Sequence, residues 1–257
     1  MLICDIYLMR IAQDAIIILI CQCAGVFVVK NLIVSAILRR VERMYLGHKY
    51  IAIEGVIGAG KTSLAQLLAE RSRAKLVLER LEENPFLPRF YQDRAKYAFQ
   101  TQLFFLLNRY SQQRELLQQD LFYDCIICDY LFAKDRIFAY LNLDEDELVL
   151  YEWIYSFLDE AIPKPDLVVY LQTSTHILME RIRHRGKDYE KNITEEYMRE
   201  LNERYNNFIF HYTQTPLLVV DADNMDFVND ERDLKELIEK IKQVKRGKEY
   251  FSLDRHR

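Results

Sequence analysis

Short apolar runs alternate with longer amphipathic segments along most of the chain, and this pattern predicts alternating strands and helices. The runs rich in Val, Ile and Leu predict strands at residues 50–54, 74–79, 124–129, 167–171 and 217–220. Apolar residues at helical spacing predict helices at residues 61–72, 84–91, 97–119, 143–161, 174–183, 195–212 and 231–244. Because apolar strands separated by helices are typical of a covered parallel sheet, the sequence predicts a three-layer α/β/α fold with a five-stranded parallel sheet.

Residues 1–43 do not follow this alternation and form an apolar N-terminal extension ahead of one predicted domain at residues 44–257. Residues 15–29 carry no charge, Lys30 interrupts the apolar run, and residues 32–38 are again apolar. A helix of the uncharged length spans only about 22 Å, which is less than the roughly 30 Å of a bilayer core. A full membrane span would therefore have to include Lys30.

Two interpretations of this extension stay open. In the first, residues 15–38 form a membrane-associated helix, and three arginines that follow (Arg39, Arg40 and Arg43) keep the domain on the cytoplasmic side. In the second, the residues before Met44 reflect the choice of start site or form a disordered or loosely helical extension, because Met44 stands shortly before the first predicted strand.

A glycine-rich motif, GVIGAGKTS, directly follows the first predicted strand and leads into the first predicted helix. Its glycines allow backbone N–H groups to turn inward toward an anion, and the start of the helix adds a positive end. In such a phosphate cradle Lys61 reaches the β- and γ-phosphates and the Thr62 hydroxyl binds Mg²⁺. The motif therefore predicts an ATP site formed by Gly55, Val56, Ile57, Gly58, Ala59, Gly60, Lys61, Thr62 and Ser63.

Acidic residues stand at the ends of the second and third predicted strands. Glu79 ends the second strand, with Glu82 and Glu83 just beyond it, and Asp129 ends the third. Strand ends beside a phosphate cradle face the ligand crevice, where a carboxylate can accept a proton from an attacking hydroxyl. Glu79 is therefore a candidate general base, with a solvated acidic turn as the alternative. Asp129 is a candidate ligand of Mg²⁺ or neighbour of phosphate, with a helix cap as the alternative.

The predicted helix at residues 97–119 carries candidate contacts to a nucleobase. Gln100 and Phe104 are four residues apart and share one helical face. An amide offers a donor and an acceptor to the edge of a base, and an aromatic ring suits stacking. Taken singly, a glutamine here is more often a surface residue.

A basic run follows the fourth predicted strand and its helix, with Gly186 near its centre. Cationic side chains on a mobile segment can cover a transferring phosphoryl group and offset its charge. We therefore expect an arginine-rich lid in which the candidate catalytic residues are Arg181, Arg183 and Arg185.

Composition excludes several other classes of protein. The net charge is −4 and no basic block is present, which argues against a nucleic-acid partner. The guanine-reading Asn-Lys-x-Asp stretch of GTPases is absent. Cys125 and Cys128 lie within one predicted strand on opposite faces, which argues against a metal pair. Thiols of this kind are typical of a reducing cytosol, so the sequence favours a cytoplasmic protein.

Order and spacing of these motifs resemble the deoxynucleoside kinase family, in the branch that includes deoxyadenosine, deoxyguanosine and deoxycytidine kinases and their bacterial relatives. The resemblance covers about residues 49–245. Besides the cradle, it rests on residues 78–93, 97–109, 128–140, 180–190 and 217–223. It implies Mg²⁺- and ATP-dependent phosphorylation of the 5′-hydroxyl of a deoxynucleoside, by an enzyme that is often a homodimer through its long helices.

The resemblance also implies roles for individual residues. It makes Glu79 the general base, Gln100 the base-reading amide and Phe138 the ring near the base. Tyr91 and Glu190 match the pair that holds the sugar 3′-hydroxyl. The lid arginines match Arg181, Arg183 and Arg185, and the loop around the donor adenine matches the stretch with Asp221 and Asp223.

One departure from the family pattern follows the third predicted strand. Many relatives carry an arginine directly after the acidic residue there, whereas this chain has Asp129-Tyr130-Leu131. Lys134 or Arg136 is expected to supply the missing charge. Because this variant resembles bacterial purine-directed relatives, deoxyadenosine or deoxyguanosine is the favoured acceptor.

Two rival functions remain. A nucleoside monophosphate kinase shares the cradle and lid but needs cations for the acceptor's phosphate, where this chain has Glu79, Glu82 and Glu83. A membrane-tethered ATP-binding regulator is suggested by residues 15–38 and would turn over no acceptor.

Overall fold

The structure, a computed structural model, describes residues 44–80, 83–116 and 123–253. The chain divides into two compact units, Met1–Arg43 and Met44–Arg257. Everything predicted for residues 1–43, including the membrane-associated helix at 15–38, lies outside the described residues. Among the residues that are described, no helix is long and apolar enough to cross a membrane.

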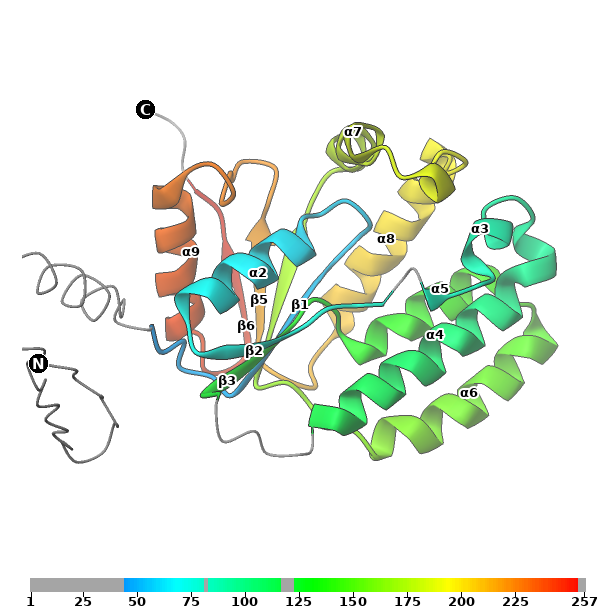
Figure 1. Cartoon of the computed structure of the whole chain (residues 1–257), viewed down its shortest axis with the longest axis horizontal. Coiled ribbons are helices and arrows are strands. Elements are labelled where there is room, and N and C mark those ends of the chain that lie inside the picture. Colours follow the sequence, from blue (N-terminus) through cyan, green and yellow to red (C-terminus); the bar gives the residue numbers. More distant parts are fainter. Residues whose placement is uncertain (1–43, 81–82, 117–122, 254–257) are drawn as a thin grey trace, which may run out of the picture. The chain divides into compact units, whose positions relative to one another are not determined.

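The second unit is an α/β fold around a parallel sheet (Figure 1). Its strands are β1 (Tyr50–Gly55), β2 (Ala74–Val77), β3 (Cys125–Cys128), β4 (Leu167–Gln172), β5 (Leu217–Asp221) and β6 (Lys248–Phe251). Its α-helices are α2 (Lys61–Arg71), α3 (Leu87–Phe90), α4 (Arg94–Leu116), α5 (Asp135–Asn142), α6 (Glu145–Glu160), α7 (Thr175–Arg185), α8 (Glu195–His211) and α9 (Glu231–Gln243). Two 3₁₀ turns, η2 (Phe132–Lys134) and η3 (Asp188–Glu190), complete the elements.

The strands run in the order β2-β3-β1-β4-β5-β6, and every neighbouring pair is parallel. Helix α9 covers one face of the sheet, and α8 with α4 and α5 lies on the other (Figure 1). Strand β1 lies between β3 and β4. The chain adds β2 and β3 on one side of β1 and then adds β4, β5 and β6 on the other side, so the direction of winding changes at β1. In open α/β sheets, ligands bind beyond the carboxyl ends of the strands at such a switch point.

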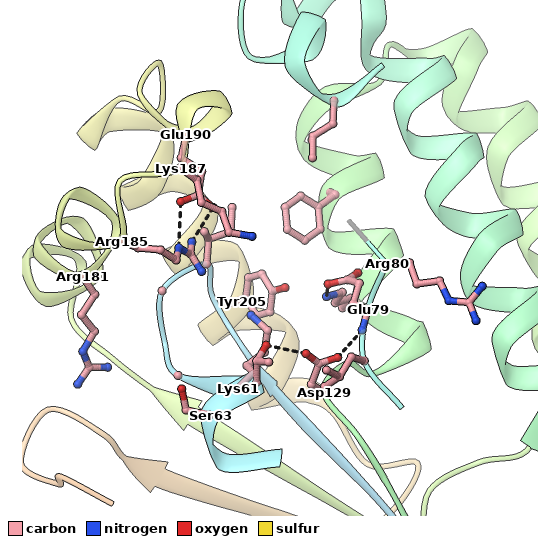
Figure 2. A pocket seen from close by; sticks show the side chains of 18 of the residues that line it. Lys61, Ser63, Glu79, Arg80, Asp129, Arg181, Arg185, Lys187, Glu190 and Tyr205 are labelled. Atoms are coloured by element: carbon pink, nitrogen blue, oxygen red, sulfur yellow. Dashed lines mark hydrogen bonds and ion pairs between the residues drawn. The ribbon is translucent and has the colours of Figure 1, made fainter. Parts of the chain in front are cut away.

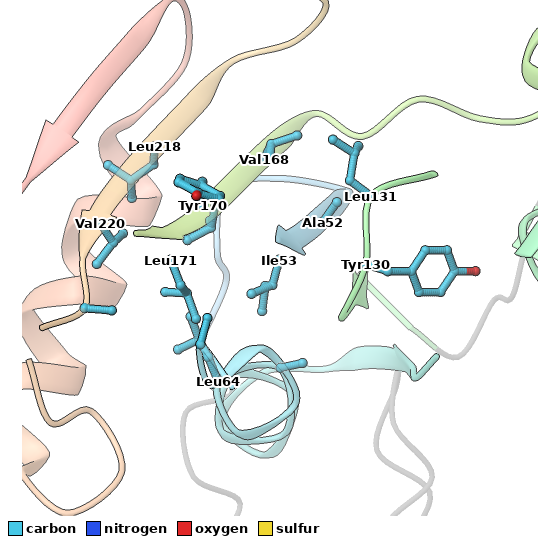
Figure 3. Packing of buried hydrophobic residues seen from close by; sticks show 14 of the residues in the cluster. Ala52, Ile53, Leu64, Tyr130, Leu131, Val168, Tyr170, Leu171, Leu218 and Val220 are labelled. Carbon is cyan, nitrogen blue, oxygen red and sulfur yellow. The ribbon is translucent and has the colours of Figure 1, made fainter. Parts of the chain in front are cut away.

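The core explains why β1 is the central strand. All six residues of β1 are buried, and Ile51, Ala52 and Ile53 have no exposed surface. Ile53 packs in a cluster with Leu64 of α2 and Leu171 of β4 (Figure 3). Burying an aliphatic side chain stabilises a fold by about 1.5–3 kcal/mol, so this cluster fixes the end of β1 firmly.

The prediction of a five-stranded sheet is wrong, because the described residues contain a sixth strand, β6. Its sequence, KEYF, has two charged residues and lacks the apolar run that identified the other strands. A strand at the edge of a sheet needs little burial, and charged side chains are common there.

The predicted strand at residues 74–79 ends early, at Val77. The backbone beyond it turns to the neighbouring strand end, where Glu79 N donates to Asp129 Oδ1 at 2.7 Å. The helix predicted at 143–161 begins at Glu145, because the Asp144 side chain caps it by accepting a hydrogen bond from Glu147 N. Thr194 caps α8 in the same way, as helix-start chemistry predicts.

Candidate active site

A cavity of about 1170 Å³ lies at the carboxyl ends of β1, β2 and β3. Its walls come from the phosphate cradle, α4, α7, α8 and the loop after β5. Single small-molecule sites commonly occupy about 300–1,000 Å³, so this cavity has room for two ligands. Figure 2 shows the side chains that converge on it.

The phosphate cradle has the backbone that its glycines predict. Gly58 and Gly60 have φ angles of 88° and 100°, a region that other residues rarely adopt. A Cβ on Gly58 would also lie 3.1 Å from the backbone oxygen of Leu178. These two positions therefore require glycine, and α2 begins directly after them.

Lys61 is folded back on the cradle. Its Nζ donates to the backbone oxygens of Gly55 at 2.7 Å and Val56 at 3.1 Å. Burial and the neighbouring charge of Lys134 lower the pKa of Lys61. The carboxylate of Glu54, followed by two others, opposes that lowering. A bound phosphate would replace the two carbonyls as the partner of the ammonium group.

Asp129 connects the cradle to the end of β2. Its Oδ2 accepts from Thr62 Oγ1 at 2.7 Å, and its Oδ1 accepts from Glu79 N at the same distance (Figure 2). The alternative that Asp129 caps a helix is wrong, because both carboxylate oxygens are used in this connection. The arrangement places two oxygen donors, Thr62 and Asp129, side by side at the mouth of the cradle.

Glu79 is a buried carboxylate held by two cations. Lys134 Nζ lies 2.8 Å from its Oε2, and Arg109 Nε lies 2.7 Å from its Oε1. Burial by itself raises the pKa of Glu79, but the charges of Arg109 and Lys134 outweigh burial and hold the pKa at about 2. The alternative of a solvated acidic turn is therefore wrong for Glu79, which stays ionised at neutral pH.

Of the two cations considered for the charge after the third strand, Lys134 lies in the cavity beside Glu79 and Arg136 does not. Lys134 is only 3% exposed and contacts Glu79 directly. The Arg136 side chain instead forms an ion pair with Glu152 at 2.8 Å and is 42% exposed. Beside β2, the charge of the ionised Glu79 is balanced by Arg109 and Lys134. Glu83 also lines the cavity, is exposed and lies 3.7 Å from Arg80, and Glu82 lies outside the described residues.

The prediction for the base-reading helix chose the wrong residues. Gln100 is exposed, and neither Gln100 nor Phe104 lines the cavity. Gln102 and Phe105 line it instead and are buried. The phase of α4 is fixed by its packing on α3 and α5, which spacing within one helix does not reveal. Arg109 could have indicated the correct face of α4 from the sequence. It is a charged residue two helical turns after Gln102, on the face that carries the apolar residues.

Gln102 and Arg109 both contact Asp135, which lies at the start of α5. Gln102 Nε2 donates to the backbone oxygen of Asp135 at 3.0 Å and also to its carboxylate. Arg109 forms an ion pair with the same carboxylate, which has no exposed surface. The deep end of the cavity is therefore lined by an amide and a guanidinium that Asp135 orients.

Three other predicted acceptor-site residues, Tyr91, Phe138 and Glu190, all line the cavity. The ring of Phe138 meets the ring of Tyr205 edge-on at 6.0 Å between centroids. Glu190 is 5% exposed, and its carboxylate accepts from Arg185 Nη2 at 2.6 Å and Nε at 3.1 Å. Glu190, predicted to contact the sugar, and Arg185, predicted to contact the phosphoryl group, thus form an ion pair with each other.

The lid arginines do not share one environment. Arg181 lines the cavity and donates to the backbone oxygens of Ala59 and Ala222, each at 3.3 Å. Arg185 also lines it, whereas Arg183 is exposed and does not. The prediction for Arg183 is therefore corrected: it stands on the outer face of α7.

In the loop after β5, Asp223 lines the cavity and accepts from Ser174 N at 2.9 Å, but Asp221 does not line it. The carboxylate of Asp221 instead accepts from Asn224 and Ser252, each at 3.0 Å, on the edge next to β6. An apolar part of this loop was missed from the sequence: Met225 and Phe227 line the cavity, and the Phe227 ring lies directly against Gly60.

Comparison with known proteins agrees with this geometry. The family model for deoxynucleoside kinase matches residues 51–245. The deoxyguanosine kinase of Bacillus subtilis (strain 168) is 34% identical over 200 residues, covering 76% of this chain and 97% of that protein. The deoxyadenosine/deoxycytidine kinase of the same organism is 29% identical over 202 residues, covering 76% and 92%.

A solved structure is similar as well. The deoxyadenosine kinase from M. mycoides with bound dATP has a TM-score of 0.65 and 28% identity to this chain. The match covers 76% of this chain and 99% of the other. The family match at residues 51–245 spans the cradle, the lid and the sheet as far as β5.

The two glutamines of α4 give a matched test of the acceptor side. Replacing the buried Gln102 (Q102A) should weaken binding of a deoxynucleoside about 10- to 100-fold, the effect of losing one or two buried hydrogen bonds. Replacing the exposed Gln100 (Q100A) should change it less than about twofold. Isothermal titration calorimetry with each deoxynucleoside measures both. Equal effects, or a larger effect at Gln100, would restore the original assignment.

Proposed function

The chain belongs to the deoxynucleoside kinase family, and from this premise we propose that it transfers the γ-phosphoryl group of ATP to the 5′-hydroxyl of a purine deoxynucleoside. The observation that carries this proposal is the position of Glu79. Its ionised carboxylate lies in one cavity with Lys61 of the cradle on one side and with Gln102 and Arg109 of α4 on the other. A base between a triphosphate site and an amide-lined pocket suits a hydroxyl nucleophile on a nucleoside.

The donor site is supported by the cradle and the lid. Backbone N–H groups of the cradle and the start of α2 bind the phosphates, and Lys61 exchanges its two carbonyl partners for phosphate oxygens. Arg181 already reaches the cradle at Ala59 and supplies positive charge where the phosphoryl group leaves. Met225 and Phe227 offer apolar surface for the adenine, next to Asp223.

Mg²⁺ fits the residues at the mouth of the cradle. Thr62 Oγ1 and Asp129 Oδ2 are adjacent oxygen donors, and Mg²⁺ in phosphoryl-transfer enzymes is commonly bound by one or two such groups plus phosphate oxygens and water. When bound, the ion would neutralise charge on the phosphates. Glu79 N holds the other oxygen of Asp129, which keeps that carboxylate oriented.

On the acceptor side, Glu79 takes the proton of the 5′-hydroxyl as the hydroxyl bonds to phosphorus. A carboxylate with a pKa of about 2 is a weak base, so proton transfer comes late, when the attacking oxygen has become acidic. Phosphoryl transfer through a loose transition state needs little base strength before that point. Positioning by Arg109 and Lys134 is then the larger contribution of the protein.

The purine preference is supported by relatives and by the pocket. The similar proteins include deoxyguanosine and deoxyadenosine kinases. The amide of Gln102 and the guanidinium of Arg109 can pair with the polar edge of a base, and Phe105 and Phe138 provide ring surface. We propose Tyr91 and Glu190 as ligands of the 3′-hydroxyl, and the cytoplasm as the place of action.

A turnover assay with separate acceptors tests the reaction. The full chain with Mg-ATP should release ADP with deoxyguanosine or deoxyadenosine and much less with the matching monophosphates. Replacing Glu79 (E79Q) should lower kcat at least about 100-fold while ATP still binds, because the group that accepts the proton is lost. Turnover only with monophosphates would indicate a nucleoside monophosphate kinase. ATP binding with no turnover of any acceptor would indicate the regulator.

The pKa of Glu79 gives a pH test of its partner. Because Lys134 lowers the pKa of Glu79, replacing it (K134Q) should raise that pKa and move the acid limb of the kcat/KM profile for the nucleoside to higher pH. The matched change R136Q, two residues away, should leave the limb in place because Arg136 pairs with Glu152. An acid limb that moves with R136Q and not with K134Q would reverse the assignment.

Association into a homodimer is supported by an exposed apolar strip on α6, formed by Val149, Leu150, Trp153 and Phe157. Trp153 is 63% and Phe157 is 62% exposed, and their rings meet edge-on at 5.4 Å. A contiguous apolar strip of this kind marks an interaction site. Because the strip runs along a single helix, a second copy can present the same strip in a two-fold arrangement. We propose that a second copy of this chain covers the strip.

Light scattering coupled to size exclusion tests this surface. The parent chain should be a dimer, and the double change W153E/F157E should give a folded monomer, because four charges would be buried in a two-fold contact. F210E alters a similarly exposed ring on α8, at 70% exposure, and should stay dimeric. A monomeric parent, or a dimeric double variant, would show that α6 is not the interface.

A further inference from the structure

Glu54, the residue directly before the phosphate cradle, is a carboxylate in an unusual place. It lies on β1 between Ile53 and Gly55, and it has no exposed surface. No ion pair to Glu54 is present among the described residues. Burying an ionised carboxylate costs several kcal/mol unless other groups compensate, so an acid here needs a physical reason.

Three hydrogen bonds provide that compensation. Oε1 of Glu54 accepts from Gly55 N at 2.8 Å and from the hydroxyl of Tyr205 at 3.4 Å. Oε2 accepts from Leu131 N at 2.7 Å. The donors come from the start of the cradle, from α8 and from the segment after β3. One side chain thus connects three elements that lie far apart in the sequence.

Each of these elements carries part of the reaction proposed above. Gly55 is the first residue of the cradle, and its oxygen accepts from Lys61. Leu131 lies between Asp129 and Lys134, which position Thr62 and Glu79. Tyr205 lines the cavity, where Figure 2 shows it together with Lys61. Glu54 itself does not line the cavity, so it acts only through its neighbours.

We propose that Glu54 is a positioning residue that holds the phosphate cradle and the segment carrying Asp129 and Lys134 in register for phosphoryl transfer. The proposal rests on the proposed function, because register matters only if donor and acceptor react in this cavity. A shift of about 1 Å between reacting groups can lower a rate about 100-fold, so a fixed connection behind the site has catalytic value.

Two changes at Glu54 test this connection. E54Q keeps the shape, but its amide N–H₂ would face a backbone donor. We expect kcat to fall about 10- to 100-fold per folded active site, with both KM values within about threefold of the parent, because register affects the transfer step more than binding. E54D is one methylene shorter, so Leu131 N loses its partner. We expect a similar fall in kcat, again with both KM values close to those of the parent.

Asp166, directly before β4, offers a control because its carboxylate binds backbone N–H groups at the start of β1, whereas Glu54 lies near the end of β1. Its Oδ2 accepts from Lys49 N at 2.7 Å and from Tyr50 N at 3.0 Å, and it does not line the cavity. D166N should lower the unfolding midpoint and leave kcat and both KM values within about twofold. A carboxylate that is merely structural would behave in this way at either end of β1.

The experiment measures steady-state kinetics of the full chain between pH 6 and 10, with folded sites counted by binding of a non-hydrolysable ATP analogue. Parent-like kcat per folded site in E54Q, or a loss confined to the KM values, overturns the proposal. If E54Q does not fold, E54D decides the matter: a parent-like rate overturns the proposal and a reduced rate supports it. If the parent itself does not turn over, the proposed function fails and not this inference alone.

Discussion

The guanidinium of Arg109 is buried between the carboxylates of Glu79 and Asp135, and the acceptor side of the cavity depends on this contact. With Lys134 the cluster has two positive and two negative groups, so the charges balance without solvent. Removing one member of such a cluster leaves an uncompensated buried charge, at a cost of about 3–5 kcal/mol. The cluster therefore fixes the end of β2 against α4 and the start of α5. Its planar fork lets Arg109 serve two carboxylates at once, which a lysine could not do with the same geometry.

The donor side is built differently. Its binding groups are backbone amides, and their directions follow from glycine conformations and from the start of α2. The acceptor side is built from charged side chains contributed by distant segments. The two sides meet through two carboxylates: Asp129 connects Thr62 to Glu79, and Glu54 connects Gly55 to Leu131. Because every residue of β1 is buried, the sheet beneath these two carboxylates is rigid. The rigid sheet keeps the hydrogen-bond distances of both carboxylates constant.

This division also explains what the sequence could reveal. The cradle is local, so nine consecutive residues were enough to predict its backbone. The parallel sheet followed from apolar runs, and only β6 escaped, because an edge strand need not be apolar. The partners of Glu79 lie 30 and 55 residues away, at Arg109 and Lys134, and no local pattern joins them.

Helix phase was the hardest part. In α4 the periodicity identifies an amphipathic helix, but Gln100 and Gln102 differ by about 200° around its axis. Which of them faces the cavity is decided by Asp135 on α5, whose carboxylate and backbone oxygen both accept from Gln102. The same holds on α7, where Arg181 and Arg185 face the cavity and Arg183 does not. Residues four apart share a face of a helix and residues two apart do not. One tertiary contact therefore determines which face of each helix points to the cavity.

The electrostatics of the cavity have a further consequence for the proposed reaction. Lys61 is surrounded by the carboxylates of Glu54, Glu79 and Asp129 and is repelled by Lys134. A triphosphate that entered this region without a cation would add its negative charge to those carboxylates. The cradle alone does not offset that charge, since Lys134 is already paired with Glu79. If ATP binds as its magnesium complex, as proposed, with the metal beside Thr62 and Asp129, the conflict would be resolved, and the fixed carboxylates would help to orient the complex.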